Sequence, residues 1–302
     1  DLVRSRGLGD VYKRQGFTFF SASMWVGQQL ADGLDFWGFL GSLILGGIIL
    51  GIYTGLLGYV GAKTGLSLDL LSQRAFGEKG SYLPSAMTSF TQIGWFGVGS
   101  FVSGGTATPN FARFAKDGKA GAITTVVAFF IGNSLMFFFG AVSSIFVGGN
   151  DIFEVMVRLN LFYLAVLVLG LNIWTTNDNA LYTAGLGLAN IFHQRKKPMV
   201  LLSGIIGTVA SVWLYYNFCG WLNILNCTLP PVGMILVLAY FMNKEDFETD
   251  QPKLKTIDWF AVAGVILGAI VANLLHWGIA SINGMAVAAV CYCVGQAVNK
   301  RK

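Results

Sequence analysis

Long apolar runs separated by short polar connections dominate the chain. Each run is close to the roughly 20 apolar residues that a helix needs to cross a bilayer. The runs lie at about 16–34, 36–61, 81–111, 120–148, 157–192, 198–217, 219–242, 257–275 and 279–298. None requires the period-two alternation of a membrane β-barrel. The pattern therefore predicts an all-α polytopic membrane protein with about 9 hydrophobic spans and no room for a soluble domain.

The first 15 residues, DLVRSRGLGDVYKRQ, do not follow this pattern. They are polar, stop abruptly at Gly16, and lack the apolar core and small-residue cleavage site of a signal peptide. The string looks like translated sequencing-adapter sequence. We therefore expect residues 1–15 to be a non-native leader and residues 16–302 to form a single transmembrane domain.

Composition agrees with a membrane protein and argues against a nucleic-acid binder. Hydrophobic residues make up 54% of the chain and charged residues 12%, against about 25% charged in soluble domains. The net charge of +5 comes from short clusters of Lys and Arg between apolar runs, without a continuous basic face. The four cysteines lack metal-type spacing with histidine, so we expect no metal cluster and no cofactor.

The basic clusters predict orientation, because positively charged connections stay on the cytoplasmic side. From residue 120 onward, basic and nearly uncharged connections alternate, which places the basic loops and the C-terminus in the cytoplasm. The run 81–111 breaks the alternation. The connections before and after it are both basic, so both should be cytoplasmic, whereas a single span would put them on opposite sides of the membrane. Either this run forms a re-entrant hairpin, or an odd number of spans is missing within it.

Polar residues inside apolar runs are costly in lipid and are therefore candidates for function. In the run 157–192, Asn172, Thr175 and Thr176 are spaced three and four apart and share one helix face. Hard oxygen ligands on one face suit a small cation such as Na⁺. The alternative is a polar packing seam, or a helix end with residues 177–179 at the membrane interface.

Two further groups suggest a broken helix and a flat binding pocket. The segment 20–27, FSASMWVG, favours either local unwinding that frees carbonyl groups or close helix packing. Gln92 and Trp95 are three residues apart, so an amide and an indole can face one pocket, and Phe101 offers a second aromatic plane. A heteroaromatic base fits such a pocket by stacking and edge hydrogen bonds, with plain packing as the alternative.

Three remaining features limit the interpretation. Residues 66–76 can form a short amphipathic helix at the interface. The Pro230-Pro231 pair predicts a hinge or kink in the run 219–242. A membrane enzyme is not indicated, because Asp178 stands nearly alone within the spans, without paired carboxylates or a histidine cluster.

Five motifs resemble the nucleobase:cation symporter family, in particular its bacterial cytosine transporters. They are TFFSASMW (18–25), LGIYTGLLGYVGAKTGL (50–66), TQIGWFGVG (91–99), GNSLMFFFGA (132–141) and LGLNIWTTNDNALY (169–182). The resemblance implies twelve helices with two inverted repeats in the leucine-transporter-type fold. It also implies secondary transport of cytosine by cation symport across the bacterial cytoplasmic membrane, without nucleic acid or an obligate protein partner. Another purine- or hydantoin-like heterocycle is the alternative substrate.

The resemblance further implies roles for individual residues. The base would be held by residues of the third, sixth and eighth helices, namely Gln92, Trp95, Ser100, Phe101, Ser103 and Asn177. The cation would be held by the side chains of Asn172, Thr175 and Thr176 and by the backbone carbonyls of Phe20 and Ser23. An oxygen-rich site without carboxylates favours Na⁺ as the coupling ion, with H⁺ as the alternative.

One departure from the family concerns residues 98–101. In the family a long stretch with the fourth and fifth helices separates the third helix from the GSF segment, whereas here the segment 95–99 runs directly into Ser100-Phe101. Loss of helices 4 and 5 and fusion of parts of 3 and 6 removes an odd number of spans, which explains the charge pattern. The sequence thus predicts an incomplete fold with a junction near 98–101, and a non-functional truncated permease is the alternative to an active transporter.

Overall fold

The computed structural model describes residues 24, 26–28, 34–98, 108–149, 152–249, 252, 254–275 and 277–299, and these ranges contain helices and no strands. The first half comprises α3 (Phe36–Thr64), α4 (Leu68–Phe76), α5 (Tyr82–Val98), α7 (Pro109–Ala112), α8 (Gly118–Val126), the π-helical segment η1 (Val127–Gly132) and α9 (Asn133–Val147). The second half comprises α10 (Ile152–Arg158), α11 (Phe162–Phe192), α12 (Lys196–Tyr216), α13 (Phe218–Met242), α14 (Lys244–Glu248), α15 (Trp259–Leu274) and α16 (Ala280–Asn299).

The long helices confirm the all-helical membrane class. Within the described ranges, five helical stretches are long and apolar enough to cross a bilayer: Phe36–Thr64, Gly118–Val147, Lys196–Leu214, Gly220–Met242 and Ala280–Asn299. α15 is a shorter apolar helix. Helix α5 covers part of the predicted run 81–111, and α11 covers almost all of the predicted run 157–192. Most of the junction near 98–101 lies outside the described residues.

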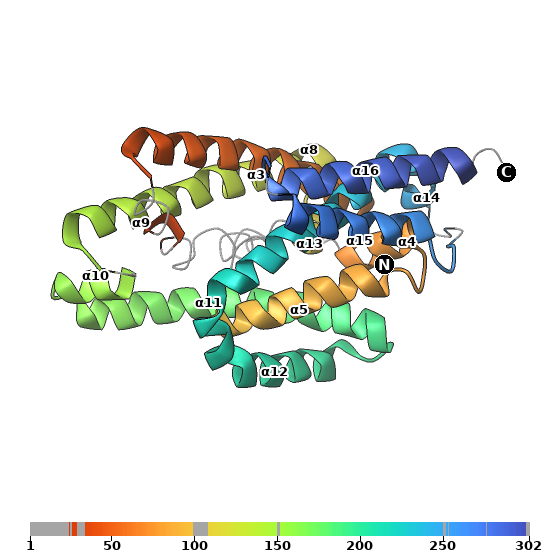
Figure 1. Cartoon of the computed structure of the whole chain (residues 1–302). Coiled ribbons are helices and arrows are strands. Elements are labelled where there is room, and N and C mark those ends of the chain that lie inside the picture. The colour runs from red at the N-terminus through yellow and green to blue at the C-terminus, as the bar shows by residue number, and fades with distance from the viewer. Residues whose placement is uncertain are drawn as a thin grey trace.

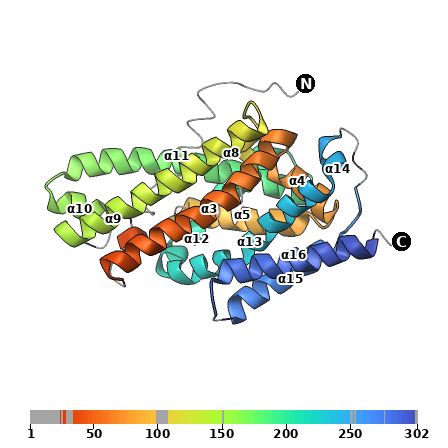
Figure 2. The ribbon, with the colours of Figure 1, turned by 90° about the horizontal axis from the view of Figure 1, so that it is seen from above.

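Figures 1 and 2 show the long helices running roughly along one direction, with α4 and α14 at one end of the molecule and α10 at the other. The most extensive helix contacts define three groups: α3 with α8, α5 with α11 and α12, and α13 with α15 and α16. Helix α13 also contacts α3, α4 and α5 and so connects the groups. It is continuous from Phe218 to Met242 although Pro230 and Pro231 lie inside it.

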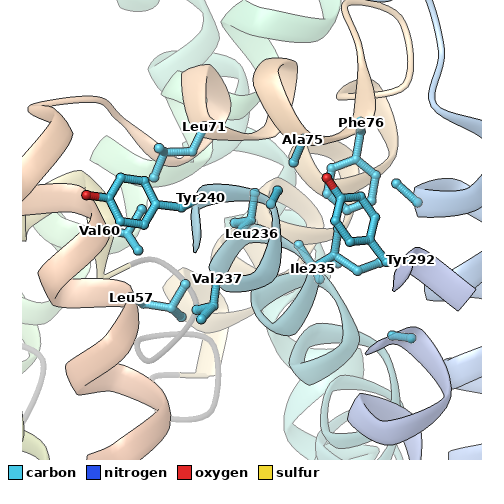
Figure 3. Packing of buried hydrophobic residues seen from close by; sticks show 14 of the residues in the cluster. Leu57, Val60, Leu71, Ala75, Phe76, Ile235, Leu236, Val237, Tyr240 and Tyr292 are labelled. Atoms are coloured by element: carbon cyan, nitrogen blue, oxygen red, sulfur yellow. The ribbon is translucent and has the colours of Figure 1, made fainter. Parts of the chain in front are cut away.

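The largest buried cluster lies where α13 meets α3, α4, α15 and α16. Figure 3 shows Tyr292 beside Phe76, while Tyr240 lies on the side of Val60 and Leu71. Leu236 and Tyr240 are completely buried in this cluster. The helix predicted at 66–76 is present as α4, and this cluster buries its apolar face, so α4 is docked onto the bundle and does not merely lie at the interface.

Local sequence signals explain the helix ends. Asp35, Ser67, Asp117 and Asp258 each cap a helix by accepting a hydrogen bond from a backbone N–H three residues ahead. Such caps satisfy donors that the first helical turn leaves unpaired. At the other end of α3, Gly65 takes φ 70°, a left-handed conformation that glycine adopts without steric cost. Helix boundaries here therefore follow from short-range chemistry.

Replacing Asp117, the capping residue of α8, tests whether the cap stabilises the helix start. Asp117 Oδ1 accepts from the Ala120 amide at 2.7 Å. We expect Asp117→Ala to lower the free energy of unfolding by about 1 kcal/mol, because that amide loses its partner at the helix start. Thermal unfolding in detergent measures the change, and Asp117→Asn, which keeps the acceptor, serves as the control. Equal losses in both variants would contradict the capping role.

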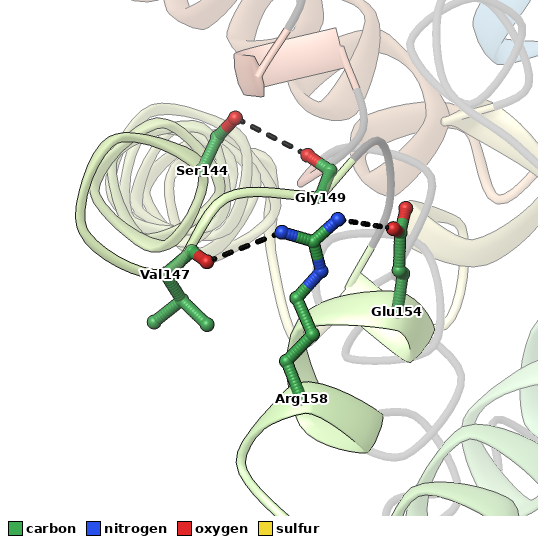
Figure 4. A network of polar contacts seen from close by, with 5 residues as sticks. All are labelled: Ser144, Val147, Gly149, Glu154 and Arg158. Carbon is green, nitrogen blue, oxygen red and sulfur yellow. Dashed lines mark hydrogen bonds and ion pairs between the residues drawn. The ribbon is translucent and has the colours of Figure 1, made fainter.

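The connection between α9 and α10 is ordered by one arginine, as Figure 4 shows. Arg158 donates to Glu154 Oε1 at 2.6 Å and to the Val147 carbonyl at 3.5 Å, while the Ser144 hydroxyl donates to the Gly149 carbonyl at 3.3 Å. The Arg158–Glu154 side chains are 48% and 38% exposed, so this pair contributes little to stability. Its effect is to fix the path of the chain from α9 into α10.

Candidate functional site

Helices α5 and α11 meet along a row of polar side chains, here called the polar seam. The helices run antiparallel, because Ser85 accepts from Asn190 at 2.9 Å while Ser89, further along α5, donates to the Ala184 carbonyl at 3.1 Å. Gly187 lies directly against Ser89, which allows this close approach. Helical spacing adds the other members, so the seam comprises Ser85, Thr88, Ser89 and Gln92 on α5 and Asn179, Thr183 and Asn190 on α11.

The seam is fully bonded at the end next to α4. Asn190 donates to Ser81 and Ser85 and accepts from Gln73 of α4 at 2.6 Å. The Ser85 hydroxyl donates to the buried carboxylate of Asp69, also on α4, at 2.7 Å. Burial raises the pKa of Asp69 to about 6, although the Ser85 hydrogen bond and the charge of Arg113 act to lower it. At this end, side-chain hydrogen bonds join α4, α5 and α11 to one another.

Farther along the seam, polar groups lack partners. Thr88 Oγ1, Gln92 Nε2 and Thr183 Oγ1 are buried without a hydrogen bond among the described residues. Buried polar groups in folded proteins are almost always hydrogen-bonded, so several unpaired groups in one place mark a position suited to a polar ligand. Gln92 is only 1% exposed. The arrangement can therefore offer an amide donor to a ligand in the middle of the helix pair.

The predicted residues on α5 and α11 occupy this same region. Gln92 belongs to the seam, and Trp95 lies on α5 three residues beyond it. Asn172, Thr175 and Thr176 lie on α11, and Asn172 is half-buried. Ser100, Phe101, Ser103, Phe20 and Ser23 lie outside the described residues, as do the side chains of Trp95, Thr175 and Thr176.

The antiparallel register relates these positions to one another. Since Ser85 pairs with Asn190 and Ser89 with Ala184, continuing both helices places Trp95 level with about Asn179 and Val98 level with about Thr176. Trp95 and Thr176 would then differ by about 4.5 Å along the helix axis. The candidate base site and the candidate cation site are therefore expected within one helical turn.

Sequence reasoning missed Asn179 and Thr183. Asn172, Thr176, Asn179 and Thr183 follow one another at spacings of four, three and four, so they form one stripe on α11. Asn179 is 1% exposed, whereas Asn177 is half-buried and two positions away, near the opposite face. The spacing alone could have identified both residues. The assignment of Asn177 to the base stays a prediction.

The opposite face of α5 is apolar and packs on α13. Gly94 approaches the Trp221 ring so closely that a Cβ would lie 2.2 Å from it, and Phe90 lies edge-on to Trp221 with ring centroids 4.6 Å apart. An apolar cavity of about 410 Å³ extends from there between α5, α11, α12 and α13. Helix α5 is thus held between a polar and an apolar partner, which fixes the direction in which Gln92 points.

Comparison with known proteins gives a consistent result. The family described as permease for cytosine/purines, uracil, thiamine, allantoin matches residues 17–107 and 98–296. The cytosine permease of Escherichia coli (strain K12) is 36% identical over 380 aligned residues, which cover 95% of this chain and 90% of that protein. The allantoin permease of Bacillus subtilis (strain 168) is 34% identical over 82 residues, covering 27% of this chain and 16% of that protein.

Solved structures show the same fold. Mhp1, a nucleobase-cation-symport-1 family transporter in a closed conformation with bromovinylhydantoin bound, superposes with a TM-score of 0.77 at 14% identity, covering 95% of this chain and 91% of that one. The inward-facing conformation of Mhp1 gives a TM-score of 0.69 at 13% identity, with 97% and 88% coverage. The chain thus has the leucine-transporter-type fold that its motifs predicted.

Proposed function

Since this chain belongs to the family of permeases for cytosine/purines, uracil, thiamine and allantoin, we propose that its site is built to import cytosine by symport with Na⁺. The observation that carries the proposal is the buried Gln92 amide, whose Nε2 has no partner among the described residues, one turn before Trp95 on the same helix. An amide donor next to an indole plane suits a neutral, flat base with acceptors on its edge.

The energetics favour a base at this position. Stacking on an aromatic ring contributes about 1–3 kcal/mol per base. A hydrogen bond from Gln92 adds more than its usual net value, because it also relieves a buried donor that is otherwise unpaired. Trp95, Ser100, Phe101, Ser103 and Asn177 complete the proposed pocket. The share of identity with cytosine permease favours cytosine over another heterocycle such as a hydantoin.

The coupling ion is proposed to be Na⁺, held by Asn172, Thr175 and Thr176 and by the carbonyls of Phe20 and Ser23. Neutral oxygen ligands are what a hard cation prefers. The carboxylate nearest in sequence, Asp178, is exposed, so it does not point into the helix pair. A site of this kind binds a cation without taking up a proton.

The proposed orientation places α4, α14 and the C-terminus in the cytoplasm of a bacterial cell, in its inner membrane. Figures 1 and 2 show these three features at one end of the molecule. Lys63 at the end of α3, Lys119 at the start of α8, Lys196 at the start of α12 and Lys244 at the start of α14 belong to that end. Positive charges at the cytoplasmic ends of spans support this orientation.

A second candidate is that the chain, as it stands, does not transport. The family match falls into two segments that meet at 98–107, and the alignment with cytosine permease extends over 380 positions although the chain has 302 residues. Both observations support an internal deletion near 98–101. Trp95 and Phe101, six residues apart, would be separated by about 9 Å along a continuous helix instead of facing each other.

Uptake of radiolabelled cytosine into transporter-deficient cells tests both candidates. The chain as given is expected to show background uptake, while a version with the family segment inserted between Val98 and Ser100 shows Na⁺-dependent uptake. Thymine and a hydantoin serve as competitors that measure specificity. Uptake by the unmodified chain would refute the deletion argument, and a restored version that carries only another heterocycle would refute the assignment of cytosine.

A further inference from the structure

A second cavity lies away from the polar seam, between the start of α3, the start of α9 and the first part of α13. Its volume is about 450 Å³, and a short helical piece at 26–28 closes one side. None of the described residues that line it is charged, and five of them carry an amide or a hydroxyl: Ser42, Asn133, Ser134, Asn223 and Asn226. We call it the outer amide cavity.

The wall of this cavity contains a buried amide without a partner. Asn133 is 5% exposed, lines the cavity, and its Oδ1 accepts no hydrogen bond among the described residues. It directly follows the π-helical segment η1, and such segments occur frequently at functional sites. Gln28, two residues after the cavity-lining Val26, is 2% exposed, and neither of its amide atoms has a partner among the described residues.

The backbone around the cavity adds a further acceptor. Pro230 has no N–H to donate to the carbonyl of Asn226 one turn earlier in α13. On the other side, Gly27 and Gly140 let the 24–28 segment and α9 approach closely, since a Cβ on Gly27 would lie 2.2 Å from the Phe137 carbonyl. The helices around the cavity are therefore closely packed, and Asn133 Oδ1 is a polar atom of the wall that no described residue bonds.

The chemistry of the lining selects one class of ligand. The described lining residues carry no charge, so they cannot compensate the desolvation of an ion. Asparagine amides present a donor and an acceptor side by side, which matches the adjacent donors and acceptors on the edge of a nucleobase. Phe137 and aliphatic residues supply apolar contact for its faces. A small, neutral, planar heterocycle can hydrogen-bond to the amides with its edge and contact the apolar side chains with its faces.

The location fits a position on the way to the seam. The cavity residues lie in the first half of α3 and near the start of α13, whereas Lys63 and Lys244 lie at the opposite ends of these helices. By the positive-inside rule the cavity is in the outer half of the membrane. Trp221 packs against α5 at Gly94, and the next residues of α13, Leu222 and Asn223, line the cavity. The start of α13 and helix α5, whose opposite face carries Gln92, therefore lie between the outer amide cavity and the polar seam.

We propose that the outer amide cavity is a second binding position for the nucleobase, occupied on the outer side of α13 before the base reaches Gln92 and Trp95. The inference takes its ligand from the proposed function and therefore rests on it. It assigns a ligand-binding role to Asn133, Asn223 and Asn226, which the inner site does not use.

Cysteine protection in the full chain tests the proposal. Ser42→Cys, in a background with the four native cysteines replaced by serine, places a small thiol in the cavity wall of the protein in lipid nanodiscs. We expect saturating cytosine to slow its reaction with a small methanethiosulfonate reagent about fivefold. Ser211→Cys on α12, outside the cavity, serves as the matched control and should react at an unchanged rate.

Two further variants separate this cavity from the inner site. With Trp95→Ala added, protection of Ser42→Cys should persist, because the outer position does not use the indole. With Asn133→Leu, the cytosine concentration for half-protection should rise about tenfold, equivalent to ~1.4 kcal/mol. Asn226→Leu repeats this test if Asn133→Leu does not fold.

The outcomes decide between the two proposals. Unchanged labelling in the presence of cytosine, or protection that disappears with Trp95→Ala, overturns the outer position. Cytosine uptake by the restored permease without protection would leave the proposed function intact and remove only the outer position. Protection without uptake in the restored version would keep the cavity as a binding site and reject transport.

Discussion

Trp95→Ala and Thr176→Ala are each expected to reduce cytosine uptake to background in a permease with the segment after Val98 restored. In the proposed site, the first removes the ring on which the base stacks, and the second removes an oxygen ligand of the coupling cation. Loss of stacking alone costs about 1–3 kcal/mol, or up to a hundredfold in affinity. The register of α5 and α11 places Trp95 and Thr176 within one helical turn of each other. Loss of the base site should therefore weaken cation binding, and loss of the cation site should weaken base binding.

Matched replacements at exposed positions control for general damage. Trp37 on α3 is 74% exposed, and the exposed Thr208 hydroxyl on α12 donates to the Gly204 carbonyl of its own helix. Trp37→Ala and Thr208→Ala should leave cytosine uptake within about twofold of the restored permease. Initial rates at several Na⁺ concentrations distinguish the two sites, since Thr176→Ala should raise the Na⁺ requirement before it affects cytosine affinity. Full uptake by both site variants would reject the assignment.

The second large effect concerns Asp69, which joins α4 to the polar seam. Its pKa is raised from 3.8 to about 6, mainly because burial disfavours the carboxylate. Between pH 4 and 6 the folded protein therefore binds more protons than the unfolded chain, so the free energy of unfolding falls as pH rises. The loss through this one group is on the order of 2–3 kcal/mol once it is fully ionised.

Asp69→Asn should remove that dependence. The Asn amide oxygen can still accept from Ser85, whose hydroxyl now donates to Asp69 at 2.7 Å. At pH 7.5 the variant is expected to be more stable than the parent, and at pH 4.5 the difference should shrink to about a third of that value. Asp246→Asn on the exposed helix α14 is the control. Thermal unfolding across this pH range gives the answer, and parallel curves for parent and Asp69→Asn would contradict the burial argument.

Asp69 also shows why the sequence predicts the helix α4 but not its docking onto the bundle. The pattern at 66–76 predicts an amphipathic helix correctly, because the apolar spacing is local. Its docking depends on Asp69 meeting Ser85, and Gln73 meeting Asn190, which is 117 positions away along the chain. Contacts between such distant residues leave no periodic signal in either segment.

The cavity at Asn133 illustrates the same limit. The motif GNSLMFFFGA marked residues 132–141 as family-like, but no spacing connects Asn133 with Ser42 or with Asn226. Helices α3, α9 and α13 bring these three side chains to one cavity. Likewise, the Pro230-Pro231 pair predicts a hinge or kink, and only the structure shows that α13 stays one continuous helix there, packed against several other helices.

The sequence by itself determined that this is a helical membrane protein, where its spans lie, and which polar residues of α5 and α11 to examine. These follow from hydrophobic length, charge placement and three-to-four spacing, all of which are local. Only the tertiary structure decided that α5 and α11 run antiparallel along a shared polar seam, and that Asn179 and Thr183 belong to it. It also decided that α3, α9 and α13 enclose a cavity lined by asparagine and serine side chains. Those results depend on which helix faces pack together, and burial of one face against another is a property of the assembled chain.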